Sequence, residues 1–209
     1  MSNEGAPDPK IYYAEKLAQH GATPESVDVT RDGQRLRFKI ILDALGETHN
    51  CSILDVGCGY GAFYSYLIDD CQRYSISYSG VDICDPMIQA AKSHRPNVHF
   101  ATRDIVTDPL PQSYDFVVAS GLFQFNHSWG PAEALIKAMW QHTRHTLVFN
   151  MLSVDTPMDE NWVNEEFHVE PERAIHFCRS LTKYWSAKHD YRLNDFTIIM
   201  RREPIQIVG

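Results

Sequence analysis

The chain has no long hydrophobic run and carries little positive charge. None of the apolar stretches in its 209 residues approaches the length of a membrane-spanning helix, which needs roughly 20 apolar residues. The first ten residues, MSNEGAPDPK, are polar and acidic, unlike a secretory signal peptide. The formal net charge of -8 argues against a general nucleic-acid-binding protein, because such proteins present basic faces to phosphates. We therefore expect a cytoplasmic protein that binds neither membrane nor nucleic acid.

Cysteine pairs with the spacing of metal ligands are also missing. The five cysteines are Cys51, Cys58, Cys71, Cys84 and Cys178, and no two of them form a C-x-x-C motif. We therefore expect no zinc or other metal site. An odd number of cysteines without an export signal indicates reduced thiols in a cytosol. Cys58 has no histidine or other base near it in sequence, so a nucleophilic role is not favoured.

Predicted strands and helices alternate from Cys51 onward. The strands are CSILDV, SISYSGVDI, NVHFAT, YDFVVAS and TLVFNML, and the helices between them are GAFYSYLIDDCQR, PMIQAAKSHR and PAEALIKAMWQHTRH. This alternation predicts an α/β fold with parallel strands, right-handed crossovers and helices on both faces. The last two apolar runs, KYWSAKHDY and FTIIMRRE, are separated by only RLND. Because so short a connection cannot make a parallel crossover, they are predicted to form an antiparallel hairpin.

We expect one domain over residues 1–209, with an N-terminal helical cap (1–47) on an α/β core (48–209). The cap contains two predicted helices, KIYYAEKLAQHG and DGQRLRFKIILDALG. Residues 31–39, around the start of the second helix, carry Arg31, Arg35, Arg37 and Lys39, which we expect on a solvated helix face. Residues 152–170 are polar and acidic and are predicted to form a variable loop. Loops of that length are usually functional or disordered.

A glycine-rich turn follows the first predicted strand in the segment ILDVGCGYGAF. Gly57, Gly59 and Gly61 stand there at alternate positions. Glycine lets a ligand approach the backbone closely, and ligands of doubly wound sheets bind beyond the carboxyl ends of the strands. GCGYGA also satisfies the dinucleotide fingerprint, which does not by itself decide the ligand. An NAD(P)-dependent oxidoreductase therefore stays an alternative at this point.

Three carboxylates at successive strand ends favour a different cofactor. Asp55 lies two positions before the first glycine, where it would repel a pyrophosphate and attract a cation. Asp82 ends the second strand, where an acid can bind ribose hydroxyls, and Asp104 ends the third, where it can bind an adenine amine. Asp82 could instead cap the next helix, for which Asp85 is the better N-cap candidate, and Asp104 could be an ordinary loop acid. Their joint placement favours an adenosine ligand with an amino-acid tail.

Four segments together resemble the motifs of class I S-adenosylmethionine-dependent methyltransferases. They are ILDVGCGYGAF, SGVDICDPMIQAA, ATRDI and YDFVVASGLF, and the resemblance covers about half of the chain. The terminal HDYRLNDFTIIMRR is similar to the last part of that fold. The resemblance implies a Rossmann-like seven-stranded sheet of order 3-2-1-4-5-7-6 with an antiparallel last strand. It also implies S-adenosyl-L-methionine as cofactor and S-adenosyl-L-homocysteine as product.

The same resemblance implies a role for individual residues. The glycine loop would lie under the methionine tail, Asp55 would face its ammonium group through water, and Asp82 would hold the ribose. The remaining positions are Ile83 and Met87 beside the adenine, Asp104 and Ile105 at its edge, and Ser120 and Gly121 beside the sulfonium.

The acceptor is expected to be a small molecule, methylated on oxygen or nitrogen. The fourth strand ends in ASGLF, without the acid of metal-dependent catechol methyltransferases or the Asn/Asp-Pro-Pro-aromatic motif of nucleic-acid amino-methyltransferases. Tyr13, Phe123 and Trp162 are candidate pocket residues that could equally be core. A neutral hydroxyl acceptor needs a general base, for which His127 and His189 are the candidates. A methyltransferase-fold protein that binds without catalysis remains a further alternative, and the sequence does not predict an oligomeric state.

Overall fold

A central β-sheet organises the protein in the computed structural model, which describes residues 8–46, 48–125, 128–155, 166–192 and 194–205. Over these residues the sheet is 8-stranded, with the order β3-β2-β1-β4-β5-β8-β7 and with β6 paired to β5. The strands are β1 (Cys51–Val56), β2 (Ile76–Asp82), β3 (His99–Thr102), β4 (Tyr114–Ala119), β5 (Thr143–Ser153), β6 (His168–Val169), β7 (Tyr184–Lys188) and β8 (Asp195–Arg201).

Strand direction confirms the predicted fold class. The pairs β1–β2, β2–β3, β1–β4 and β4–β5 are parallel, whereas β8 runs antiparallel to both of its neighbours, β5 and β7. With the two-residue strand β6 set aside, this order is 3-2-1-4-5-7-6. The last two strands form the predicted antiparallel hairpin.

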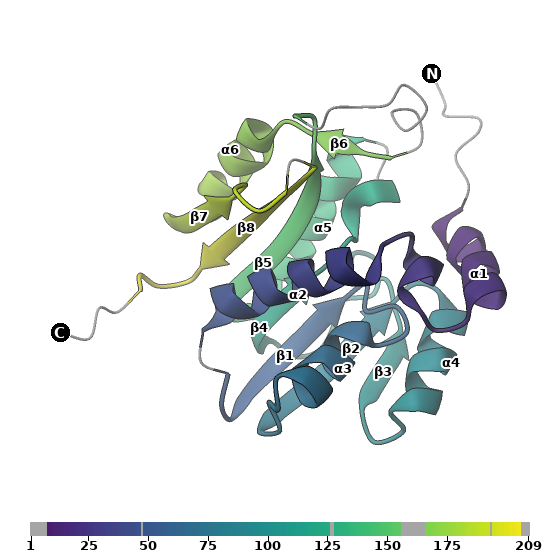
Figure 1. Cartoon of the computed structure of the whole chain (residues 1–209). Helices are drawn as coiled ribbons and strands as arrows, with labels where there is room; N and C mark the ends of the chain where they lie inside the picture. The colour runs from purple at the N-terminus through teal and green to yellow at the C-terminus, as the bar shows by residue number, and fades with distance from the viewer. Residues whose placement is uncertain (1–7, 47, 126–127, 156–165, 193, 206–209) are drawn as a thin grey trace.

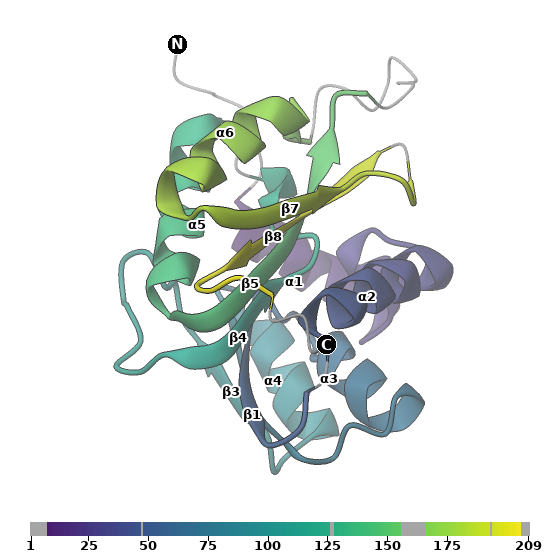
Figure 2. The ribbon, with the colours of Figure 1, turned by 90° about the vertical axis from the view of Figure 1, so that its left-hand side faces the viewer.

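Helices cover both faces of the sheet. They are α1 (Pro9–His20), the 3-10 helix η1 (Pro24–Val27), α2 (Arg31–Leu45), α3 (Ala62–Ser65), the π-helix η2 (Tyr66–Asp70), α4 (Asp85–His94), the 3-10 helix η3 (Phe123–Phe125), α5 (Trp129–Gln141) and α6 (Pro171–Leu181). Figure 2 shows α5 and α6 on one side of the strands and α2 and α3 on the other. None of the helices in the described part of the chain is long and apolar enough to cross a membrane.

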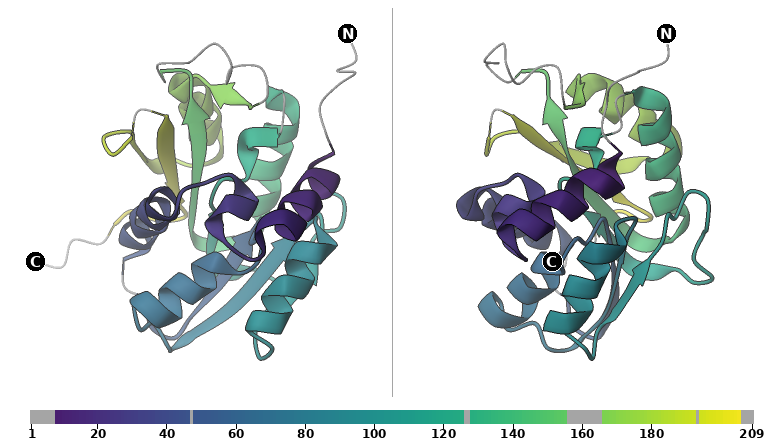
Figure 3. Two further views of the ribbon diagram at one scale, coloured as in Figure 1. Left: turned by 45° about the vertical axis from the view of Figure 1, so that its right-hand side comes forward. Right: turned by 90° about the vertical axis from the view of Figure 1, so that its right-hand side faces the viewer.

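Each face has its own hydrophobic core. Ile136, Met139 and Cys178 of α5 and α6 pack on one face, and Ile41 and Ile88 of α2 and α4 pack on the other. α2 crosses in front of the central strands (Figure 1) and contacts both β5 and β8. α1 packs beside α4 (Figure 3), so the N-terminal helices lie next to the edge where the parallel strands end.

Several local predictions were wrong. The helix expected over residues 131–145 ends at Gln141, and its last residues begin β5. Part of the loop expected over residues 152–170 forms β6, which pairs with β5. The helix after the glycine loop is a short α3 that continues as a π-helix. α4 has Cys84 at its N-cap, and Asp85 is the first helical residue. Arg37 is not on a solvated face, because its side chain is 11% exposed and pairs with buried Asp195.

Candidate active site

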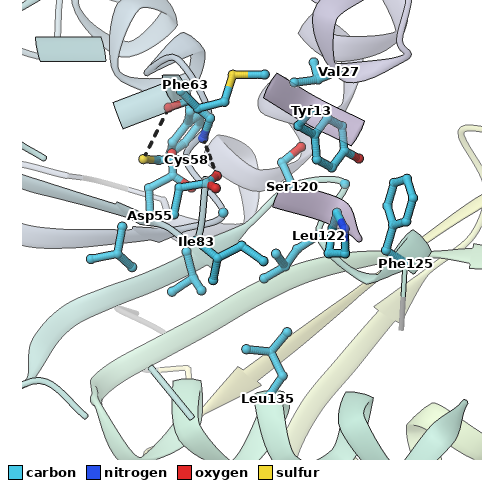
Figure 4. Close-up of a pocket in the computed structure, with 18 of the residues that line it drawn as sticks. Tyr13, Val27, Asp55, Cys58, Phe63, Ile83, Ser120, Leu122, Phe125 and Leu135 are labelled. Atoms are coloured by element: carbon cyan, nitrogen blue, oxygen red, sulfur yellow. Dashed lines mark hydrogen bonds between the residues drawn. The ribbon is translucent and has the colours of Figure 1, made fainter. Parts of the chain in front are cut away.

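A cavity of about 380 Å³ lies at the carboxyl ends of β1, β2 and β4. Its walls are the glycine loop, these strand ends and residues from α1, α2, α4, η3 and α5. Figure 4 shows Asp55 and Cys58 on one side, Tyr13, Val27 and Phe125 on the other, and Leu135 reaching in from α5. Segments far apart in the sequence therefore meet at the place where the glycine loop predicts a ligand.

The three glycines of the loop have two different roles. All have positive φ angles, 72° at Gly57, 53° at Gly59 and 81° at Gly61, which glycine adopts without strain. Gly57 and Gly59 line the cavity. Gly61 does not line it, and a Cβ at this position would lie 3.0 Å from Cζ of Phe100 and 3.5 Å from Cβ of Ala91. Gly61 therefore allows α3 to pack closely against β3 and α4.

Asp55 places a buried carboxyl group in the cavity wall. It is 3% exposed, and the Tyr78 hydroxyl donates a hydrogen bond of 2.5 Å to its Oδ2. Burial raises the pKa of Asp55 to about 7, against the smaller lowering effect of the Tyr78 hydrogen bond. An ionised carboxylate in such a place is favoured by a nearby cation.

Asp82 holds the glycine loop and the start of α4 together. Its Oδ2 accepts a hydrogen bond of 2.9 Å from the Gly59 N–H, and its Oδ1 accepts one of 2.8 Å from the Cys84 N–H. Burial raises the pKa of Asp82, and these backbone hydrogen bonds act in the opposite direction. The helix-start role considered for Asp82 is therefore present. Because each carboxylate oxygen can accept a second hydrogen bond, this role leaves room for ribose hydroxyls.

The residues expected beside the adenine also line the cavity. Ile83, Met87, Asp104 and Ile105 all contribute to the wall, with Met87 1% and Ile105 2% exposed. Asp104 is exposed and closes a turn, because its Oδ1 accepts from the Val106 N–H at 2.9 Å and its Oδ2 accepts from the Thr107 hydroxyl at 3.1 Å. Asp104 is therefore a loop acid that closes a turn, and it also forms part of the cavity wall.

Ser120 and Gly121 line the cavity at the end of β4, beside a buried polar network. The Gly121 N–H donates to Asn150 Oδ1 at 2.9 Å, and Asn150 Nδ2 donates to Asp195 Oδ1 at 3.2 Å. Arg37 of α2 binds the same carboxylate. Our sequence reasoning missed Arg37, Asn150 and Asp195. The helical spacing from Arg37 to buried Ile41 was a signal that Arg37 faces inward.

Only some of the candidate substrate-binding and catalytic residues lie at the cavity. Tyr13 lines the cavity, and Gln124 Nε2 donates to its hydroxyl oxygen at 2.5 Å. Phe123 does not line it, because the ring is 1% exposed and packs in the core against Phe149. His189 lies away from the wall, with its Nδ1 3.9 Å from Asp155 Oδ2. Trp162 and His127 lie outside the described residues.

Comparisons with known proteins place the chain in a family. A family model described as a methyltransferase domain matches residues 53–146. A protein of Mycobacterium tuberculosis named as a methyltransferase, Rv1506c, is 30% identical over 162 residues, which are 72% of this chain and 93% of that protein. The chain belongs to the class I S-adenosylmethionine-dependent methyltransferases. Membership in this family makes S-adenosylmethionine the cofactor of the methyltransferase described here.

Solved structures share the fold of this methyltransferase across nearly all of its length. Magnesium protoporphyrin IX methyltransferase from Synechocystis PCC 6803, crystallised with S-adenosylmethionine, has a TM-score of 0.68 at 14% identity and covers 95% of this chain and 99% of its own. The N-methyltransferase NodS from Bradyrhizobium japonicum WM9, crystallised with S-adenosylhomocysteine, has a TM-score of 0.66 at 16% identity and covers 91% of this chain and 98% of its own. At 14% and 16% identity, the likeness to these two structures shows a shared fold and nothing more.

Proposed function

We propose that this methyltransferase transfers the methyl group of S-adenosylmethionine to an oxygen or nitrogen atom of a small molecule bound beside Gly121. The observation that carries the proposal is the pair of carboxylates, Asp55 and Asp82, on the same cavity wall as the glycine loop. A cation with ribose hydroxyls suits this pair, whereas a pyrophosphate would be repelled by Asp55. The apolar and aromatic walls fit a small-molecule acceptor.

The residues present fit the cofactor. Asp55 would face the ammonium group through water, Asp82 would bind the ribose hydroxyls through its remaining lone pairs, and Ile83 with Met87 would contact the faces of the adenine. Asp104, which lines the same cavity, would accept a hydrogen bond from the adenine amine. The cofactor supplies an electrophilic methyl group on sulfur. The chain supplies alignment of the acceptor with that group, an effect worth roughly 7–11 kcal/mol in favourable cases.

The described cavity wall offers no histidine as a general base. This favours an acceptor that is already nucleophilic, such as a free amine, a phenolate or a carboxylate, because a neutral hydroxyl would need proton removal. His127 remains a candidate base from the sequence, and His189 would have to act from outside the wall. The exposed acids and the net charge of -8 also favour a small acceptor over a nucleic acid.

The test is methyl transfer to a metabolite library from methyl-labelled cofactor, read by product mass. A labelled product establishes the enzyme and its acceptor. Binding of S-adenosylhomocysteine without any product would instead favour the non-catalytic binding protein. Calorimetry with NADH separates the oxidoreductase alternative, since tight NADH binding and none for S-adenosylhomocysteine would overturn the proposal.

Five free cysteines support the reducing cytoplasm as the compartment of this methyltransferase.

A further inference from the structure

A second cavity borders the glycine loop and is lined mainly by polar side chains. Its volume is about 350 Å³, within the range of small-molecule sites. It is bounded by Arg31 and Arg35 of α2, Tyr60 of the glycine loop, Tyr66 of η2 and Arg95 at the end of α4. The helices α2, α3 and α4 lie on one face of the sheet (Figure 1). We call this hollow the second cavity, as distinct from the active-site cavity.

Three guanidinium groups meet two carboxylates in the second cavity. Arg35 Nη1 donates to Asp70 Oδ2 at 2.7 Å, and Arg95 Nη2 donates to Asp69 Oδ2. Arg31 forms no ion pair with the residues that the structure describes. The lining arginines and acids therefore leave one positive charge in excess, in a chain whose net charge is -8. Because both acids are already paired, the second cavity favours an anion.

The two paired arginines keep donors for a ligand. A guanidinium group has five N–H donors. Arg35 uses one of them at Asp70, and Arg95 reaches Asp69 through Nη2 alone. The Cζ of Arg35 also lies 5.5 Å from the ring centroid of Tyr66, a contact that holds the guanidinium in place. Side chains ordered in this way lose less freedom when they bind an anion.

A phosphate monoester matches these donors better than a carboxylate does. It carries a charge of about -1.5 to -2 and three acceptor oxygens, so it can bind guanidinium groups that come from different helices. A carboxylate is already satisfied by one bidentate arginine. Arg31 and Arg35 belong to α2, whereas Arg95 follows α4. His94 lines the same cavity and adds a positive charge when it is protonated.

The uncharged part of the wall fits a small organic body. Pro24, Phe38 and Tyr60 contribute ring surfaces to the second cavity. Inorganic phosphate would leave these surfaces to water, whereas the organic part of an ester would cover them. The wall therefore favours a phosphate ester over the free ion.

Tyr60 belongs to the walls of both cavities. Tyr60 and Gln34 are among the residues that line the second cavity and the active-site cavity alike. The Tyr60 hydroxyl donates to Gln34 Oε1 at 3.4 Å, a long hydrogen bond that holds this partition weakly. Tyr60 directly follows Gly59, whose N–H binds Asp82. A ligand that holds Tyr60 in place would therefore order the glycine loop before the cofactor binds, which favours cofactor binding.

We propose that the second cavity binds a small phosphate ester and that its occupation strengthens cofactor binding through Tyr60. This inference goes beyond the proposed function, because it requires a bound cofactor but no particular acceptor. The competing interpretation is a hollow that holds only solvated ion pairs, and the experiment separates the two.

The experiment compares Arg31→Gln with Lys39→Gln. Both substitutions remove one positive charge from α2. Arg31 lines the second cavity, whereas Lys39 lines neither cavity and pairs with exposed Asp43. Since Arg31 is exposed and has no ion pair among the described residues, its replacement should leave the fold intact.

The probes are phenyl phosphate and glycerol 1-phosphate, each paired with its parent alcohol, phenol or glycerol. Inorganic phosphate is a further probe, which distinguishes an ester site from a site for the free ion. Binding is measured by ligand-observed NMR at constant ionic strength. S-adenosylhomocysteine is kept saturating, so that the cofactor's place in the active-site cavity is filled.

We expect the unmodified protein and Lys39→Gln to bind at least one ester about tenfold more tightly than its alcohol, the effect of charge-assisted hydrogen bonds. The same ester should bind more tightly than inorganic phosphate, and Arg31→Gln should lose most of its preference over the alcohol. Absence of any ester preference in the unmodified protein would overturn the proposal. An equal loss in both variants, or full retention in Arg31→Gln, would do the same, because the ester would then bind elsewhere.

The link to the cofactor is tested by calorimetry with S-adenosylhomocysteine, in the presence and absence of the ester that binds. We expect about fivefold tighter binding with the ester present, a value at the lower end of coupling between sites. Tyr60→Ala removes the shared side chain and should bring this ratio close to one, whatever its effect on S-adenosylhomocysteine affinity itself. An unchanged affinity in the unmodified protein, or the same ratio in Tyr60→Ala, would refute coupling through Tyr60.

Discussion

Asp55 links the chemistry of the cavity to pH at the scale of a single residue. Its folded pKa of about 7, raised mainly by burial, lies above the ordinary value of 3.8. The folded protein therefore holds this proton more tightly than the unfolded chain does. The contribution favours folding at low pH and is lost as the pH rises from about 4 to about 7.

Two consequences of Asp55 titration can be measured. Affinity for S-adenosylhomocysteine should fall as the pH drops below about 7, approaching tenfold per pH unit, because its ammonium group pairs with the ionised carboxylate. Asp55→Asn should bind more weakly at about pH 8 and show a flat profile, yet melt at a higher temperature than the unmodified ligand-free protein. Calorimetry and thermal melting test this, with 5′-methylthioadenosine as the control ligand without an ammonium group. A pH-dependent affinity for that control would contradict the assignment.

Asp82 combines a structural and a proposed binding role in one side chain. Asp82→Ala should weaken S-adenosylhomocysteine binding by roughly 1.5–3 kcal/mol, the range for lost hydrogen bonds to a charged group. Asp82→Asn should weaken it less, since one acceptor oxygen remains for Gly59 or Cys84. Asp85→Ala, at the first residue of the same helix, is the control and should bind within about twofold. If both Asp82 variants fold and bind normally, Asp82 serves only the helix start.

At the scale of elements, η3 joins α1, which borders the cavity, to the segment just before β6. The Gln124 side chain binds the Tyr13 hydroxyl of α1, and its backbone carbonyl accepts a hydrogen bond of 2.8 Å from the Phe167 N–H, just before β6. η3 itself follows Ser120 and Gly121 in the chain. A ligand bound at the end of β4 would therefore be connected to both segments through the short helix η3.

Hydrogen exchange should report this connection. We expect slower exchange in α1 and in residues 166–169 when S-adenosylhomocysteine binds, as for elements that close over a ligand. Tyr13→Phe should speed exchange in both segments by about two- to tenfold, the value of one hydrogen bond. Tyr12→Phe is the matched control, because that hydroxyl bonds Asp28 and does not reach η3. Equal effects of the two substitutions would show that η3 does not connect the segments.

The sequence predicted the elements better than their boundaries. Alternating apolar runs were sufficient for the α/β class, and the short RLND connection for the antiparallel hairpin, because both follow from chain geometry. The strand order came from the resemblance to class I methyltransferases. The start of β5 was not predictable, since Thr143 and His145 extend a helical pattern and become strand only through pairing with Tyr114 and Arg202.

Prediction of the candidate site had the same limit. The glycine loop and the three acids follow strand ends, so the sequence located them, and the structure places Asp55, Asp82 and Asp104 in one cavity wall. Phe123 was a pocket candidate that could equally be core, and Gly61 was assigned to the ligand with the rest of the glycine loop. Tertiary packing buries Phe123 in the core and brings Gly61 against Phe100. Asp195 lies far from Arg37 in the chain, and no local pattern connects them.

At the scale of the whole molecule, the Arg37–Asp195 pair fastens α2 to β8. Asp195→Ala should lower the free energy of unfolding by about 3–5 kcal/mol, because it leaves a largely buried guanidinium without its partner. Asp43→Ala removes the acid of an exposed pair, in which Lys39 Nζ lies 2.6 Å from Asp43 Oδ2 on the same helix. That control should cost under about 1 kcal/mol. Urea unfolding measures both, and similar small changes would mean that the buried pair adds little.

The place of β8 between β5 and β7 has a consequence for the order in which the protein assembles. During synthesis β7 leaves the ribosome before β8, yet its described pairing partner in the sheet is β8. β5 likewise presents an unsatisfied edge over most of its length until the same strand arrives. The nascent chain must therefore hold two strand edges apart and admit the later strand between them, a non-local step that slows folding and exposes edges to other chains. Because β8 also brings Asp195, Arg37 in the cavity wall acquires its counter-ion only when this insertion is finished, so a newly made chain becomes competent for its ligands late.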